Sequence, residues 1–290
     1  MEVTLRPLRA EDVDAAYDVQ VAAFAAHDRR MGDVVEPDTP ERTARRHRRL
    51  HHFLAHDPDG SWVADTGDGI AGVALASMRD GLWGLSLLVV DPALHGRGIG
   101  RRLLDAALSY ADPGGRGVIM ATRDRGAIHL YAGAGFELHP QIRASGVIRA
   151  PRRPAASPRV RPGTPADRDL VERVDREVRG ASRGPDHEML AWSDHFVVDD
   201  DAGRGYAYLH GGEVQTIAAT DDATAAALLE TALAQVAGAG VEAVVEHLNA
   251  RQQWAVRIAD EAGLTLAPSG PGFWRGFGPP AAYLPSGPYL

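Results

Sequence analysis

Three glycines at alternate positions, Gly96, Gly98 and Gly100, form the stretch of this sequence best suited to chemistry. They follow an apolar run, Leu85–Val90, that predicts a buried strand, and they open a helical pattern that continues to Tyr110. A helix N-terminus exposes backbone N–H groups and carries partial positive charge, and glycine lets a phosphate approach the backbone. The stretch therefore predicts a site for a phosphate-containing ligand.

Of two common phosphate-binding patterns, one is excluded and the other matches poorly. The P-loop of nucleotide-binding proteins requires a lysine, and all 31 basic residues of this chain are arginine. The dinucleotide fingerprint G-x-G-x-x-G requires a glycine at the position of Arg101. Arg97, Arg101 and Arg102 would instead add positive charge beside a phosphate.

A second group of residues, in the stretch 124–136, follows the next expected strand, Val118–Thr122. The stretch holds Asp124, Ala127, Leu130, Tyr131, Gly135 and Phe136. Tyr131 lies near the end of a short expected helix, which Gly135 can terminate in the left-handed conformation. A lone tyrosine of this kind is typical of a helix that faces the core, so a functional interpretation depends on the glycine-rich stretch as well.

The two stretches together resemble the coenzyme A-binding motifs of the GCN5-related N-acetyltransferase (GNAT) family. The family patterns run approximately V-x-P-x-x-Q/R-x-x-G-x-G/A and N-x-x-A-x-x-L-Y-x-x-x-G-F. This chain departs from them at His95, where the family has glutamine or arginine, and at Asp124, where it has asparagine. Because the family contacts its cofactor there largely through the backbone, the change at His95 is a mild one.

The resemblance implies transfer of an acetyl group from acetyl-CoA, a co-substrate, to a primary amine of a small molecule or peptide. The amine would attack directly in a ternary complex, with the Val90 N–H binding the oxyanion and Tyr131 protonating the departing thiolate. The implied cofactor-binding residues are Leu88, Val89, Val90, His95, Gly96, Arg97, Gly98, Ile99, Gly100, Arg101, Asp124, Ala127, Leu130 and Tyr131. No metal site is expected. The alternative is a catalytically silent acyl-CoA-binding or sensor protein.

The sequence leaves the general base of this reaction open. Many family members carry a glutamate on or beside the central strand, whereas residues 82–90 of this chain contain no acidic residue. The candidates are Asp33, Glu36, a histidine such as His52, an ordered water and the α-carboxylate of Leu290.

The expected helix over residues 41–56 is strongly basic. We interpret it as a solvated face above a core stripe of Leu50, Phe53 and Leu54. The alternative is a wall that meets the acceptor or the phosphates of the cofactor.

The order of expected elements repeats after residue 158, so the fold class is α/β (α+β) with two tandem GNAT-like domains. Each would have a mixed, mainly antiparallel central sheet flanked by helices. The expected domains are residues 1–150, with the acetyl-CoA site, and residues 159–290, a degenerate copy, joined by a proline-rich linker at 151–158. Asp221 and Asp222 stand where the first copy has its glycines, and their carboxylates would repel a diphosphate.

Two segments outside the motifs carry further expectations. Residues 136–149 predict two closing strands of the first domain, interrupted at Pro140, and residues 28–40 predict a loop. The aromatic-rich tail, residues 273–290, is expected to pack against the body, as core of the last strands or as a lid on a substrate groove.

Composition bounds the partners and the location. A net charge of −8 over 290 residues argues against a nucleic-acid partner. The absence of cysteine excludes disulfides, thiolate zinc sites and cysteine nucleophiles. No secretory signal or long apolar run is evident, so we expect a cytoplasmic protein without a membrane partner. It would be a monomer, as a pseudo-dimer of two domains, or a homodimer.

Overall fold

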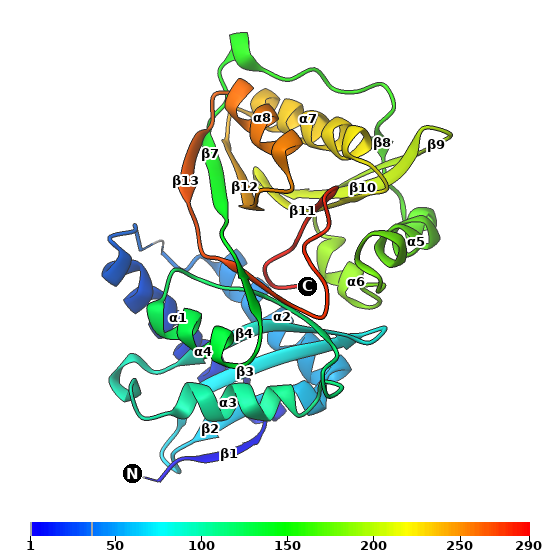
Figure 1. The fold of residues 1–290 in the computed structure, drawn as a ribbon. Coiled ribbons are helices and arrows are strands. Elements are labelled where there is room, and N and C mark those ends of the chain that lie inside the picture. Colours follow the sequence, from blue (N-terminus) through cyan, green and yellow to red (C-terminus); the bar gives the residue numbers. More distant parts are fainter. Residues whose placement is uncertain (1, 36) are drawn as a thin grey trace.

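The computed structural model describes residues 2–35 and 37–290, which form two sheets with helices on their faces (Figure 1). In the first sheet the neighbouring strands are, in order, β1 (Thr4–Pro7), β2 (Ser61–Asp65), β3 (Ile70–Arg79), β4 (Leu82–Val90), β5 (Arg116–Met120), β14 (Gly272–Arg275) and β6 (Glu137–His139). β4 and β5 run parallel, and the other neighbouring pairs are antiparallel.

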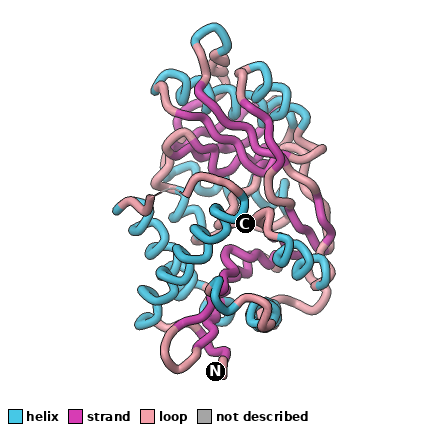
Figure 2. Tube along the Cα trace, turned by 90° about the vertical axis from the view of Figure 1, so that its left-hand side faces the viewer, coloured by secondary structure: helices cyan, strands magenta, loops and turns pink. Residues whose placement is uncertain are grey.

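The second sheet repeats this pattern. Its neighbouring strands are, in order, β13 (Thr265–Pro268), β7 (Ile142–Val147), β12 (Glu242–Leu248), β11 (Glu213–Ala219), β10 (Gly203–His210), β9 (Asp194–Asp200) and β8 (Arg161–Pro162), and β15 (Tyr283–Leu284) also pairs with β11. β11 and β12 are its parallel pair. Figure 2 shows the two sheets as separate layers with the C-terminus between them. The predicted tandem of mixed, mainly antiparallel sheets is confirmed.

Helices cover the faces of both sheets. They are α1 (Val13–Met31), α2 (Pro40–His56), α3 (Ile99–Leu108), α4 (Arg125–Gly133), α5 (Arg168–Arg179), α6 (Asp186–Leu190), α7 (Asp222–Ala239) and α8 (Gln253–Glu261). α2 and α3 lie on opposite faces of the first sheet, because Leu50 shares a core with Leu87 whereas Leu103 shares another with Leu85. α7 and α8 cover the outer face of the second sheet (Figure 1).

The two sheets exchange a strand. Both closing strands predicted within residues 136–149 form, but β7 lies in the second sheet, between β12 and β13. In return, β14 from the end of the chain inserts between β5 and β6 of the first sheet. We retain residues 1–150 and 159–290 as a proposed division of the sequence, with one strand of each contributed to the sheet of the other.

The space between the sheets holds a core built from both halves of the chain, and charged side chains are buried within it. Arg79 donates to the carboxylates of Asp57 and Asp186, and His52 Nε2 lies 2.6 Å from Asp186 Oδ1. Buried charges are costly without such partners, so this network specifies how the two halves dock.

Two segments complete the comparison with the sequence. α1 continues to Met31, where a loop was predicted from residue 28, because Gly32 adopts φ +75° and ends the helix there. The tail packs as expected, and Tyr289 and Leu290 are buried. Among the described residues, no helix is long and apolar enough to cross a membrane.

Candidate active site

Strand β4 is fully paired on one side and only half paired on the other. It pairs with β3 from Leu82 to Val90, but with β5 only from Leu82 to Leu85. β5 ends at Met120, so the second half of β4 has lost its neighbour. The register with β3 also shifts between Leu85 and Leu87, which makes Ser86 an extra, bulged residue. An open backbone edge therefore begins close to Ser86.

The alternation of hydrogen bonds decides which residues face this edge. The N–H of Asp91 donates to the carbonyl of Ala71, next to β3. Because antiparallel pairs alternate, Val89 also turns its N–H and C=O toward β3, whereas Leu88 and Val90 turn theirs away from it. Of the three predicted strand residues, Val89 is therefore the one whose backbone groups do not face the open edge. Its side chain packs in the core on the α2 side.

The glycine loop continues from this open edge. Gly96 and Gly98 both have φ of +77°, and a Cβ on either would meet no atom within 4 Å. Gly98 is the N-cap of α3, which starts at Ile99. Within residues 2–35 and 37–290, no acceptor is recorded for the backbone N–H groups of residues 96–101. These donors, in open space at a helix N-terminus, fit a diphosphate.

The fold brings the two predicted motifs together. A Cβ on Gly100 would lie 3.7 Å from Val90 Cγ2 and 3.9 Å from Leu130 Cδ2. Leu88 and Ala127 are half-buried beside the same cluster of apolar side chains. Arg97 and Arg101 are exposed next to the loop. The open edge, the glycine loop and α4 thus border one region.

His95, the main departure from the family pattern, contacts the open edge directly. Its Nε2 lies 3.1 Å from the carbonyl oxygen of Val90. The imidazole thereby engages one of the two carbonyls that Leu88 and Val90 turn away from β3. A ligand pairing with Val90 O would have to displace this ring.

Asp124 holds α4 in place. Its side chain accepts from the N–H of Ala127 at 2.9 Å, which caps the helix, and it also accepts from Arg30 of α1 at 2.7 Å. A second ion pair joins Arg123 to Asp33 at 2.5 Å. The end of α1 is therefore tied to the turn before α4.

Tyr131 of α4 is buried, with its ring edge-on to Phe273 at a centroid distance of 5.5 Å. Burial, with a smaller effect from Asp124, raises the pKa of its hydroxyl well above the ordinary value. The hydroxyl is therefore protonated at neutral pH and can donate a proton. Phe273 belongs to the exchanged strand β14, so the end of the chain completes the surroundings of this tyrosine.

The predicted candidates for the base occupy different environments. Asp33 is paired with Arg123, and His52 is buried against Asp186. Glu36 lies outside the described residues. The α-carboxylate of Leu290 stays a prediction. Leu290 itself lies against β4. A Cβ placed on Gly84 would be only 3.0 Å from the Cβ of Leu290.

His247, which the sequence interpretation missed, lies close to the end of β5. It sits in an irregular part of the β12–β7 pairing and has φ of +64°, a strained conformation for a residue other than glycine. Its Nδ1 lies 3.2 Å from Gln141 Oε1, and Gln141 in turn contacts Met120, the last residue of β5. Burial lowers the pKa of His247 to about 4, so the ring is neutral at physiological pH. No pattern in the sequence indicates this backbone conformation.

Known proteins share these motifs and this architecture. The family model described as "Acetyltransferase (GNAT) family" matches residues 23–136, which include β4, the glycine loop and α4. Residues 23–136 of the chain therefore match the GNAT family.

The structural relatives extend the likeness to the whole chain. A putative acetyltransferase from Pyrococcus horikoshii is 15% identical with a TM-score of 0.73, and the match covers 98% of this chain and 94% of that chain. A tandem GNAT protein from the clavulanic acid biosynthesis pathway is 15% identical with a TM-score of 0.60, over 96% and 99% of the two chains. At these identities the likeness concerns the fold.

A curated relative matches only a segment. An uncharacterized protein of Mycobacterium leprae (strain TN) is 39% identical over 79 residues, which are 27% of this chain and 22% of that protein. The chain therefore spans about a fifth of the length of this relative.

The second GNAT-like copy differs at the groove that matches the open edge of β4. β11 pairs with its parallel neighbour β12 only at Glu213 and Val214. Farther along β11, the tail strand β15 lies against Ile217 and Ala218, and Ala219 N–H donates to Ala282 O at 3.0 Å. The chain thus fills with its own backbone the edge that stays open in the first copy.

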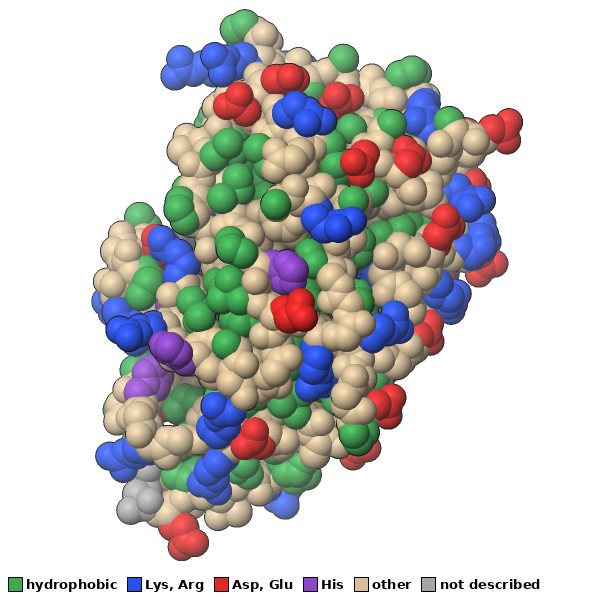
Figure 3. Space-filling model, in the orientation of Figure 1, with side chains coloured by type: hydrophobic (Ala, Val, Ile, Leu, Met, Phe, Trp, Pro, Cys, Tyr) green, Lys and Arg blue, Asp and Glu red, His purple; other side chains and the backbone are tan. Residues whose placement is uncertain are grey.

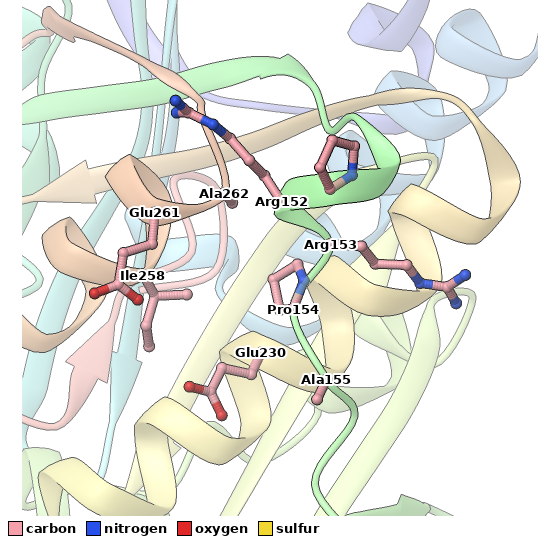
Figure 4. Close-up of a pocket in the computed structure, with 9 residues that line it drawn as sticks. Arg152, Arg153, Pro154, Ala155, Glu230, Ile258, Glu261 and Ala262 are labelled. Atoms are coloured by element: carbon pink, nitrogen blue, oxygen red, sulfur yellow. The ribbon is translucent and has the colours of Figure 1, made fainter.

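Other surface features of the molecule lie apart from these residues. A groove of about 330 Å³ is formed by the linker, α7 and α8, and Figure 4 shows Glu230, Glu261, Arg152 and Arg153 around it. None of its lining residues belongs to the glycine loop or α4. On the face drawn in Figure 3, acidic and basic side chains are interspersed rather than gathered into one basic patch.

Proposed function

We propose that this GNAT protein transfers an acetyl group from acetyl-CoA to a primary amine of a small molecule or peptide, by direct attack in a ternary complex. The observation that carries the proposal is the open edge of β4 at Leu88 and Val90, which leads into the unpaired N–H groups of residues 96–101. An extended amide-containing arm suits the first feature, and a diphosphate suits the second.

Several of the predicted residues have a physical role in this proposal. The N–H groups after Gly96 would hold the diphosphate, with Arg97 and Arg101 nearby to screen its charge. The N–H of Val90, directed away from β3, would bind the oxyanion that develops on the thioester carbonyl. Tyr131 would protonate the departing thiolate, since its raised pKa keeps the hydroxyl protonated at neutral pH.

We propose His247 as the group that orients the attacking amine. If Nδ1 donates to Gln141 Oε1, the lone pair on Nε2 is free to accept a hydrogen bond. With a pKa of about 4 the imidazole is a weak base, so it would position the neutral amine and leave the proton to solvent. In this role, a residue of the second GNAT-like copy would take part in the reaction of the first.

A specific observation supports the second candidate function, a silent acyl-CoA-binding or sensor protein. His95 engages the carbonyl of Val90, and residues 82–90 carry no carboxylate. In a sensor the cofactor would bind without turnover.

Thiol release separates the two candidates. The full-length protein is incubated with acetyl-CoA and a panel of amines, and the free thiol is followed with a chromogenic disulfide, while calorimetry measures cofactor binding. Amine-dependent thiol release supports the transferase. Binding without release from any amine supports the sensor, and absence of binding contradicts both.

A further inference from the structure

The arginines on one face of α2 have no counter-charge. Arg45, Arg48 and Arg49 stand at helical spacing on the same side of the helix. The Nε atoms of Arg48 and Arg49 are enclosed without a hydrogen-bond partner, and no ion pair is recorded for these three arginines in the described part of the chain. The guanidinium of Arg48 instead lies over the ring of Trp192, 4.3 Å from its centre.

Arg49, which is half-buried, differs from the buried arginines of the same interface. Arg79 is paired with two carboxylates, and Arg183 is paired with Asp175 and donates to two tyrosine hydroxyls. Both have a raised pKa because of these partners. Burial, with smaller contributions from the neighbouring Arg46 and Arg45, lowers the pKa of Arg49 to about 10. A partly desolvated cation without an anion is costly, so this side chain suits an anion supplied by a ligand.

The C-terminal residues of the chain connect Arg49 with strand β4. Arg49 lies near Tyr289, whose carbonyl accepts from Arg183 at 3.1 Å. The next residue, Leu290, lies against Gly84 of β4, two residues before the bulge at which the edge opens. Figure 1 shows the C-terminus lying between α2 and the second sheet.

This place is distinct from the expected diphosphate site. Gly84 and Val90 are six residues apart on β4, which corresponds to roughly 20 Å along a strand. α2 also packs on the face of the sheet opposite to α3, whose N-terminus carries the glycine loop. Arg49 therefore lies on the face of the first sheet opposite to the glycine loop, on the side of the sheet where Leu290 packs against β4.

We propose that Arg49, assisted by Arg45, binds an anionic group on the acceptor, so that the acceptor is an amine that also carries a carboxylate or a phosphate. The inference rests on the proposed acetyltransferase function. A guanidinium binds either anion through two parallel hydrogen bonds, which compensates its desolvation and fixes the distance between anion and amine.

The test compares acceptors that differ only in the anion. The carboxylate arm uses 4-aminobutyrate against butylamine, and the phosphate arm uses phosphoethanolamine against ethanolamine. We expect the wild type to favour the anionic member of at least one pair by tenfold or more in kcat/KM, and the preferred arm identifies the anion. Arg49→Gln should lose this preference and leave the neutral amine within twofold.

Two further variants separate charge from position. Arg49→Lys keeps the charge without the fork and should retain part of the preference, and Arg257→Gln removes one exposed arginine from α8 as a matched control. Equal activity of the wild type on both members of both pairs would overturn the proposal, and so would an equal loss on both members in Arg49→Gln.

A binding measurement keeps the proposal testable if the protein is not a transferase. Succinate and inorganic phosphate are titrated against the melting temperature of the wild type and of Arg49→Gln. At least one anion should stabilise the wild type more than the variant. Equal shifts would show that Arg49 binds no anion, whereas an Arg49-dependent shift without thiol release would reject only the transferase.

Discussion

Replacement of Gly98 by aspartate tests where the phosphates bind. Gly98 has φ of +77°, and a Cβ there would meet nothing within 4 Å, so a side chain fits sterically. The left-handed conformation costs a residue other than glycine about 1 kcal/mol of folding free energy. The aspartate carboxylate would project into the space in front of the unpaired N–H groups at the start of α3.

The expected loss of affinity follows from Coulomb's law. Two unit negative charges about 5 Å apart repel by roughly 1 kcal/mol in water and roughly 3 kcal/mol at the effective dielectric of a protein surface. Since 1.4 kcal/mol is a factor of ten, Gly98→Asp should weaken acetyl-CoA binding by about 5- to 150-fold, and nearer the upper end because a diphosphate carries more than one charge.

Calorimetry with acetyl-CoA measures this effect, and two controls isolate it. Gly98→Asn keeps the size and the backbone strain without the charge, and should bind at least tenfold more tightly than Gly98→Asp. Gly114→Asp places the same charge at another open glycine, with φ of +71°, and should leave affinity unchanged. If Gly98→Asp binds acetyl-CoA as tightly as the wild type, the phosphates lie elsewhere and the reasoning fails.

The remaining predictions concern the chemistry, the second copy and the stability of the protein. Tyr131→Phe should lower kcat at least tenfold with little change in acetyl-CoA affinity, and an unchanged kcat would remove the hydroxyl from the mechanism. His247→Gln should raise KM for the amine and not the affinity for acetyl-CoA; the reverse would refute its proposed role. Because β15 fills the groove of the second copy, calorimetry should give one acetyl-CoA per chain, and two sites would contradict this. Arg183→Met should lower the free energy of unfolding in urea by about 3–5 kcal/mol, since it leaves the buried Asp175 without its main partner, and a loss below about 1 kcal/mol would refute that view. His195 and His247 both have a pKa lowered to about 4 by burial, so the unfolded chain takes up protons first, and stability should fall as the pH drops from about 6.5 to 4. A less steep fall in His195→Gln/His247→Gln than in the wild type would support this assignment, and identical profiles would contradict it.

Local signals explain what could be predicted about the first copy. The spacing of Gly96, Gly98 and Gly100 predicted the end of a strand and the start of a helix, because φ above zero at a strand–helix turn is a local requirement. The periodicity of apolar residues predicted the core helices and strands, because this pattern too involves residues close together in the chain. The family resemblance implied instead that Leu88, Val89 and Val90 bind the cofactor, and the hydrogen-bond register of the structure explains why Leu88 and Val90 face the open edge whereas Val89 does not.

The sequence by itself determined the order of elements, the tandem repeat and the two motifs, since each depends on residues close together in the chain. Only the tertiary structure decided that β7 and β14 change sheets, that β15 closes the groove of the second copy, and that Arg49 remains without a counter-ion. Pairing of distant strands and burial of a charge depend on which segments meet across long loops, and no short-range pattern encodes that meeting.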